Sequence, residues 1–348
     1  MKPALAFLAV AALLAMGDPG VHAHPSTDAR GGLSEVEGQQ GAPGGDVRVF
    51  EIRSNVHVIS GAGANVTVQI GPDGVVLVDA GSADKADQVI DAVKRLTTQP
   101  IRYIINTGPA LDHIGGNEKV ARAGQSLFYR QTGPGGNAGA ANAVSNSGFA
   151  SIVGTENLLT RMSAPTGTQQ FAVVAWPTET FSRRFKDLFI NREGIQVVFE
   201  PDAHSDSDSI VVFRRSDVIA TGDIFDMQHF PMIDVAKGGT VKGVIAALNH
   251  VLEIAIPSIP MPWLSEGGTV VIPGHGRPSE EAEVVEYRDM VTVIRDRVQD
   301  MIARGMTLDQ IRMANPTAGW RGRFGADSGP WTTNMFVEAV YRSLTAKT

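Results

Sequence analysis

One stretch of the sequence decides the fold, and it runs Ile104-Ile105-Asn106-Thr107-Gly108-Pro109-Ala110-Leu111-Asp112-His113-Ile114-Gly115-Gly116-Asn117. The short, mostly apolar run Ile101–Ile105 leads into it and indicates a buried β-strand. A loop rich in Gly and Pro follows, and it presents two adjacent side chains that can bind a metal, Asp112 and His113. Strand ends hold side chains rigidly, while neighbouring glycines leave room for a substrate. The stretch therefore predicts a metal-binding loop at the end of a strand.

Four other segments repeat this arrangement, in which a short apolar strand ends in a loop with a candidate ligand or supporting residue. These residues are Asp79 in Val76–Gly81, His204 in Pro201–Ser205, Asp223 in Thr221–Phe225 and His275 in Val271–Gly276. A single segment of this kind is a weak signal. Five of them in order indicate that loops far apart in the sequence meet at one site.

In this order the five segments resemble the signature segments of the metallo-β-lactamase superfamily, whose loop pattern is T-H-x-H-x-D-H-x-G-G. The resemblance covers roughly residues 47–278. It implies a fold of the α/β (α+β) class, a four-layer αββα sandwich of two mixed sheets flanked by helices. The order of predicted elements agrees, because the series strands, helix, strand, helix occurs twice along the chain.

The chain departs from the family pattern at the first of the family's two metal sites. Gly108 and Ala110 stand where the family has two histidine ligands, so this site keeps only His204 and Asp223. Two ligands are too few to hold zinc. We therefore expect the first site to be lost.

The resemblance implies that the second metal site is complete. Its ligands would be Asp112, His113, Asp223 and His275. Two imidazoles and two carboxylates suit Zn²⁺, and could also suit Fe²⁺ or Mn²⁺. We expect one metal ion, most simply zinc. The alternative is that these are loop residues and turn-capping carboxylates that hold no metal.

Further side chains are expected around this site. Asp112 and His204 are the candidate catalytic residues, with His204 beside the metal as a hydrogen-bonding or proton-transfer group. Asp79 is expected to orient the Asp112–His113 loop from outside the ligand set. His229 and Glu156 are weaker candidates for lining the pocket.

Bulk composition limits the possible partners. A chain of 348 residues with 43% hydrophobic content can bury a substantial core. The formal charge of −7 argues against a nucleic-acid or anionic-membrane partner, since both need clustered Lys and Arg. The absence of cysteine excludes disulfides and thiolate zinc sites. A small-molecule substrate is the expected partner, and the oligomeric state is left open.

The N-terminal residues predict an exported protein. Lys2, the apolar run Ala4–Met16 and the small residues at Val21–Ala23 are typical of a signal peptide over residues 1–23. The alternative, a retained membrane anchor, is disfavoured because the apolar run is too short to span a bilayer comfortably. A flexible linker is predicted over residues 24–46, and a single domain with a C-terminal helical extension over 47–348. The mature chain is expected in the periplasm or outside the cell.

Two further segments carry structural expectations. The run Gln131–Gly148 is rich in Gly, Ala, Asn and Ser, and its length is typical of a lid or a locally disordered segment. The C-terminal aromatic residues are expected to cap the hydrophobic core. They are Trp320, Phe324, Trp331, Phe336 and Tyr341.

Three functions remain open from the sequence. The first is a metal-dependent hydrolase of an ester, thioester, lactone or β-lactam-like bond, with water activated by the metal. The second is a catalytically inactive paralogue that uses the same cleft to bind a ligand or a partner, which the changes at Gly108 and Ala110 favour. The third is a redox or oxygen-handling role for bound iron, which no sequence feature requires.

Overall fold

The computed structural model describes residues 45–127, 148–164, 170–258 and 267–346. The expected signal peptide, nearly all of the expected linker and nearly all of the expected lid at Gln131–Gly148 lie outside these residues. No helix in the described ranges has the length and apolar character needed to cross a membrane.

The N-terminal half forms a mixed sheet of seven strands, in the order β1-β2-β3-β4-β5-β6-β7. Neighbouring strands from β1 through β4 are antiparallel, and neighbouring strands from β4 through β7 are parallel. The strands are β1 (Arg48–Arg53), β2 (Val56–Ala62), β3 (Ala64–Gly71), β4 (Gly74–Val78), β5 (Ile101–Ile105), β6 (Ser151–Thr155) and β7 (Glu179–Phe181).

The C-terminal half forms a second mixed sheet of five strands, in the order β12-β11-β10-β9-β8. Its pairs are antiparallel except for β11 and β12, which run parallel. The strands are β8 (Phe185–Ile190), β9 (Glu193–Phe199), β10 (Ser209–Phe213), β11 (Val218–Ala220) and β12 (Val270–Ile272).

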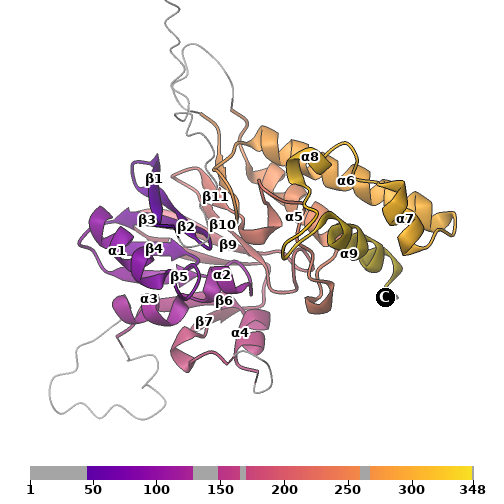
Figure 1. Ribbon diagram of the computed structural model, residues 1–348. Coiled ribbons are helices and arrows are strands. Elements are labelled where there is room, and N and C mark those ends of the chain that lie inside the picture. Colours follow the sequence, from indigo (N-terminus) through magenta and orange to yellow (C-terminus); the bar gives the residue numbers. More distant parts are fainter. Residues whose placement is uncertain (1–44, 128–147, 165–169, 259–266, 347–348) are drawn as a thin grey trace, which may run out of the picture. The chain divides into compact units, whose positions relative to one another are not determined.

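Helices connect these strands and extend the chain after β12 (Figure 1). The α-helices are α1 (Ala86–Leu96), α2 (Leu111–Ile114), α3 (Asn117–Ala123), α4 (Glu156–Met162), α5 (Val241–Ile254), α6 (Glu281–Ala303), α7 (Leu308–Ala314), α8 (Arg321–Phe324) and α9 (Thr333–Thr345). The 3-10 turns are η2 (Val173–Ala175), η3 (Gly222–Ile224) and η4 (Val235–Lys237).

Successive side chains on a strand point to opposite faces of its sheet. Each sheet therefore has one apolar face toward the other sheet and one apolar face toward the helices. On β4, Val76 and Val78 join an inner core with Phe213 of β10, so the two sheets pack face to face. Val75 and Leu77, on the other face, pack with α1 and α3.

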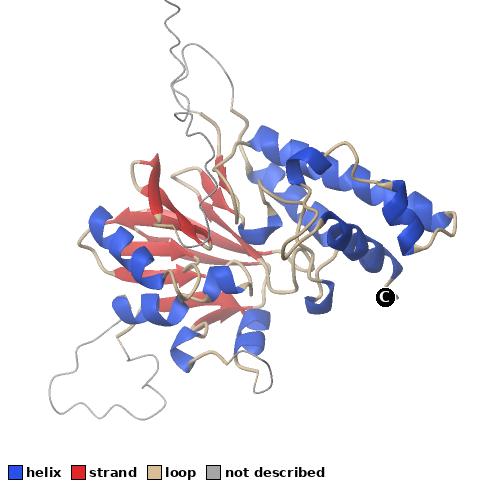
Figure 2. Ribbon diagram, in the orientation of Figure 1, coloured by secondary structure: helices blue, strands red, loops and turns tan. Residues whose placement is uncertain are grey.

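The second sheet behaves in the same way. Val211 of β10 faces the inner core, whereas Ile210 and Val212 pack with α5, α6 and α9. Helices therefore cover the outer face of each sheet, as the red and blue elements of Figure 2 show. The expected four-layer αββα sandwich of two mixed sheets is confirmed.

The C-terminal helices complete the outer layer of the second sheet. Phe324 and Phe336 are buried in the same core as α5 and α6, and the Phe336 ring stacks on Phe230 with 4.8 Å between ring centroids. Trp320, Trp331 and Tyr341 pack against this core while partly exposed. The aromatic residues therefore cap the core, as the sequence predicts.

Candidate metal centre

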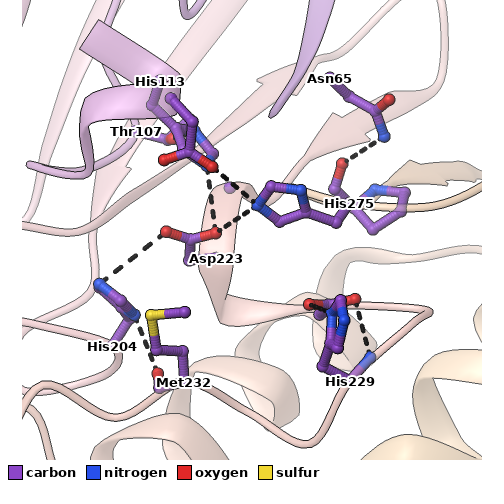
Figure 3. Close-up of polar contacts among 12 residues, drawn as sticks. Asn65, Thr107, His113, His204, Asp223, His229, Met232 and His275 are labelled. Atoms are coloured by element: carbon purple, nitrogen blue, oxygen red, sulfur yellow. Dashed lines mark hydrogen bonds and ion pairs between the residues drawn. The ribbon is translucent and has the colours of Figure 1, made fainter. Parts of the chain in front are cut away.

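Four potential ligands from three separate segments converge at one edge of the two sheets. Asp112 and His113 lie in α2, Asp223 lies in η3 after β11, and His275 lies in the loop after β12. The Nε2 atom of His113 is 3.1 Å from Oδ1 of Asp223, and Nε2 of His275 is 3.4 Å from the same oxygen. Nε2 of His275 is also 3.2 Å from Oδ2 of Asp112. Figure 3 shows the two imidazoles directed at the Asp223 carboxylate.

His113 is held in place by the buried carboxylate of Asp79, at the end of β4. Oδ2 of Asp79 lies 2.7 Å from Nδ1 of His113, and it also accepts a hydrogen bond from the Thr107 hydroxyl at 2.6 Å. The Thr107 amide donates to the other oxygen of Asp79 at 2.9 Å. With Nδ1 engaged in this way, Nε2 is the atom left to bind a metal. Asp79 therefore holds both the His113 ring and the Thr107 end of the loop.

A second support comes from Asn65 at the start of β3, which sequence reasoning missed. Its buried side-chain amide donates to the carbonyl oxygens of Pro273 at 3.0 Å and Gly276 at 2.9 Å. Its backbone amide donates to the Gly274 carbonyl at 2.8 Å. Three hydrogen bonds therefore fix the loop that carries His275, and Figure 3 shows the Asn65 side chain directed at this loop. The sequence offers no signal for this role, because a lone Asn at a strand start is commonplace.

The ends of the Asp112–His113 loop are also pinned. Asn106 and Asn117, both fully buried, exchange side-chain hydrogen bonds of 3.1 and 2.8 Å. Gly63 lies against the same loop, because a Cβ atom on it would come within 3.0 Å of the Cβ of Asp112. The loop is therefore held by β5, α3 and the turn between β2 and β3.

The histidines and carboxylates of the cluster shift one another's pKa values. Burial opposes charge on His275, but its hydrogen bonds to Asp112 and Asp223 outweigh burial and raise its pKa to about 10. Burial likewise opposes charge on His113, and the carboxylates of Asp223 and Asp79 nevertheless raise its pKa well above the ordinary value.

The carboxylates show the complementary effect. Burial would raise the pKa of Asp223, but His113 beside it lowers this pKa well below the ordinary value. Burial would also raise the pKa of Asp112, but its hydrogen bond to His275 and the charges of His275 and His113 together lower it. Two anionic carboxylates thus face two imidazoles that hold protons in the place of a cation. This donor set fits a divalent metal ion, whose binding would displace those protons.

His204 and Asp223 are the two residues that the resemblance expects to remain of the family's first metal site. Nδ1 of the buried His204 lies 2.9 Å from the carbonyl oxygen of Met232, and a carbonyl can only accept, so Nδ1 carries the hydrogen. In the neutral ring Nε2 then presents its lone pair toward Oδ2 of Asp223, 3.8 Å away. His204 therefore lines the site with an orientation that suits proton transfer.

The buried Asp208 lies beside Gly108, and sequence reasoning missed it. A Cβ atom on Gly108 would lie 3.1 Å from Oδ1 of Asp208. Burial raises the pKa of Asp208 to about 6, against the effects of His204 and of hydrogen bonds from Ser205. The Ser205 amide and hydroxyl donate to this carboxylate at 2.6 and 2.8 Å. The run of Ser and Asp after His204 was the available signal.

The remaining candidates differ in their placement. His229 lies near the centre, and its ring contacts Asp226 at 3.1 Å (Figure 3). Glu156 is exposed at the start of α4, and within the described ranges no contact joins it to the ligands. His250 pairs with Glu200, at a position away from the metal ligands. The structure therefore brings His229 to the site and leaves Glu156 out.

Comparison with known proteins bears on the fold, and one family model matches part of the chain. The sequence model described as Metallo-beta-lactamase superfamily matches residues 60–130, which include Asp79, Asp112 and His113. A search of the curated proteins gives no significant match.

Solved structures extend the likeness to most of the chain. The stereoselective inverting sec-alkylsulfatase Pisa1 from Pseudomonas sp. is similar over 86% of this chain, with a TM-score of 0.60 and 15% identity. This chain covers 50% of the alkylsulfatase, so it spans about half the length of that protein. A metallo-β-lactamase from Pontibacter korlensis is similar over 71% of this chain and 99% of its own, with a TM-score of 0.49 and 17% identity. With its segment 60–130 matched by the superfamily's sequence pattern, the chain is a protein of the metallo-β-lactamase fold.

Proposed function

We propose that this protein is a metal-dependent hydrolase that works with one metal ion. The observation that carries the proposal is the convergence of Asp112, His113, Asp223 and His275 from three distant segments, with 3.1 to 3.4 Å between the paired atoms. Most carboxylate–histidine pairs in proteins need no metal. Here Asp79 also orients the His113 ring, and Asn65 fixes the loop that carries His275. Supporting hydrogen bonds of this kind are typical of metal sites.

A divalent cation in this position supplies Lewis acidity, which lowers the pKa of a water molecule and polarises a substrate oxygen. The chain's own residues then divide the remaining tasks. The Asp112 side chain is 37% exposed, so it lies at the open side of the centre, whereas the His113 side chain is 1% exposed and anchors it. His204 presents Nε2 as a proton acceptor, because Met232 holds the hydrogen on Nδ1.

The substrate class is an ester, lactone, thioester or β-lactam-like bond, since this fold hosts hydrolysis of all of these. The alkylsulfatase likeness adds alkyl sulfate esters to the set. A screen with chromogenic esters, lactones, an alkyl sulfate and a chromogenic cephalosporin narrows the choice. Hydrolysis that disappears with a chelator and returns with zinc supports the proposal.

We also propose that the mature chain works in the periplasm or outside the cell, after removal of residues 1–23. The support is the charged, apolar and small-residue pattern of this segment. Mass spectrometry of the exported protein measures its N-terminus. Recovery of the intact chain from the cytoplasmic fraction alone would contradict the proposal.

The second candidate function is a ligand- or partner-binding module without catalysis. Gly108 and Ala110 favour it, because they remove the half of the family's centre that helps to position the attacking water. Among the described residues, one group of side chains has the spacing of metal ligands, formed by Asp112, His113 and His275, and Asp223 contacts its two histidines.

Metal content of the purified mature protein separates the two functions. The hydrolase should hold about one zinc, iron or manganese ion per chain after dialysis. His275→Ala should lose it, whereas the matched control His250→Ala should keep it, because His250 pairs with Glu200 away from the ligands. Protein that stays metal-free after loading with zinc or iron would rule out the hydrolase and favour the binding module.

A further inference from the structure

The turn after η3 holds a second histidine–carboxylate pair, formed by His229 and Asp226. Asp226 is 8% exposed, and its Oδ1 accepts hydrogen bonds from the backbone amides of Gln228 at 2.6 Å and His229 at 3.2 Å. Its other oxygen lies 3.1 Å from Nδ1 of His229. One buried carboxylate therefore fixes both the turn and the orientation of the imidazole.

This turn is attached directly to the metal centre. Asp226 forms a β-bridge with His275, and the Met227 amide donates to the His275 carbonyl at 3.1 Å. On the other side, the buried Tyr287 hydroxyl donates to the His229 carbonyl at 3.0 Å. The His229 ring is thus held at a set position relative to a metal ligand.

The His229 side chain is accessible to a ligand. The His229 side chain is 46% exposed, and no contact of its Nε2 is found within the described ranges. The hydrogen bond to Asp226 raises the pKa of His229, against burial and the charge of His275. Nδ1 faces the Asp226 carboxylate, which can only accept, so Nδ1 carries a hydrogen. The negative charge of this carboxylate favours the imidazolium form of the ring, and in that form Nε2 carries a hydrogen as well and is a donor.

We propose that His229 binds an oxyanion group of the substrate, so the substrate carries a negative charge beside the bond that is cleaved. This inference rests on the proposed hydrolase function and adds the substrate class to it. Asp112 and Asp223 would balance the charge of a bound metal ion, which leaves Nε2 of His229 as the group that selects for charge. A carboxylate and a sulfate share the required chemistry.

Two substrates that differ mainly in charge test the inference on the zinc-loaded mature protein. They are 4-nitrophenyl butyrate, which is neutral, and 4-nitrophenyl hemisuccinate, which carries a carboxylate. The preference is the ratio of kcat/KM for the anionic ester to that for the neutral ester. His229→Gln should lower this preference about tenfold through KM, the size expected for one hydrogen bond to a charged group. His229→Lys should restore part of it.

The matched control is His250→Gln, because His250 is also paired with a carboxylate but lies outside the centre. It should leave the preference at the wild-type value. An equal preference in wild type and His229→Gln, or an equal loss for both esters, would overturn the inference.

Binding of inorganic sulfate and of acetate provides a readout that needs no catalysis. In histidine-labelled protein, NMR titration with the preferred anion should shift the His229 side-chain signals. A shift with acetate points to a carboxylate on the substrate, and a shift with sulfate points to a sulfate group. Absence of both shifts overturns the inference even if esters are hydrolysed. Shifts at His229 without hydrolysis of any ester would leave the oxyanion site standing and overturn the hydrolase function instead.

Discussion

Asp79 positions the candidate metal ligand His113. Oδ2 of Asp79 lies 2.7 Å from Nδ1 of His113 and accepts a hydrogen bond from the Thr107 hydroxyl at 2.6 Å, so it fixes the ring whose Nε2 faces Asp223. Replacement by Asn keeps the shape but removes the charge that favours this ring orientation. Asp79→Asn should therefore weaken zinc binding about 10–100-fold.

Competition with a chromophoric zinc chelator measures this loss. Asp84→Asn is the control, because Asp84 lies on the same connection and is exposed. Equal zinc affinity in wild type and Asp79→Asn would show that the carboxylate serves folding alone.

Restoration of the lost histidines tests the reading of Gly108 and Ala110. The paired change Gly108→His and Ala110→His should raise metal content toward two ions per chain. Asp208 opposes it, since its Oδ1 lies 3.1 Å from the position of the new Cβ. The triple variant with Asp208→Ala should bind the second ion more tightly than the double variant. Metal analysis that stays at one ion in both variants would show that positions 108 and 110 do not match the family's histidines.

At the scale of elements, Asn65 joins β3 of the first sheet to the loop after β12 of the second. Asn65→Asp loses both side-chain donors and places an acceptor against the Pro273 and Gly276 carbonyls. Each unsatisfied buried partner costs about 1–3 kcal/mol, so the melting temperature should fall and zinc affinity should fall with it. Asn157→Asp, at an exposed position, is the control for calorimetry and zinc titration. Unchanged zinc affinity in Asn65→Asp would show that the hydrogen bonds of Asn65 stabilise the fold without positioning the metal ligands.

Sequence patterns predict the long elements and the site loops well, because both depend on local periodicity. Apolar residues at helical spacing predict a long helix over residues 280–304, and α6 (Glu281–Ala303) lies within one residue of each of these ends. Strands β6 and β7 have no clear signal in the sequence, since β7 has 3 residues and neither shows clear alternation. Strand β6 pairs with β5, which is distant in sequence, and β7 pairs with β6. Asn65 and Asp208 were missed for the same reason, because their roles come from contacts across the fold.

At the scale of the whole domain, the ligands are divided between its two halves. Asp112 and His113 come from the first half, and Asp223 and His275 from the second, so the ion pairs among them link the halves. In the metal-free protein this linkage depends on pH. The pKa of His275 is about 10, raised from an ordinary value of 6.5 by Asp112 and Asp223 against burial. The interactions of protonated His275 therefore stabilise the fold fully below pH 6.5. This contribution to stability is lost as pH rises toward 10.

Thermal unfolding of chelator-treated protein between these pH values checks this expectation. The melting temperature should decline as pH rises, and the decline should be smaller in His275→Gln. Zinc should reverse the trend, since its binding requires deprotonated imidazoles and is favoured at higher pH. A metal-free protein whose stability does not fall over this range would show that His275 is not held by the two carboxylates.

The backbone of Asp79 is left-handed, with φ at 64°. Gly and Asn adopt this conformation readily, whereas bulky or β-branched residues are strained in it. Gly and Asn would preserve the turn but release the imidazole, and Glu would keep its charge while straining the chain. Few substitutions at position 79 therefore keep both the turn and the charge beside His113, so we expect this position to vary most freely in relatives that bind no metal.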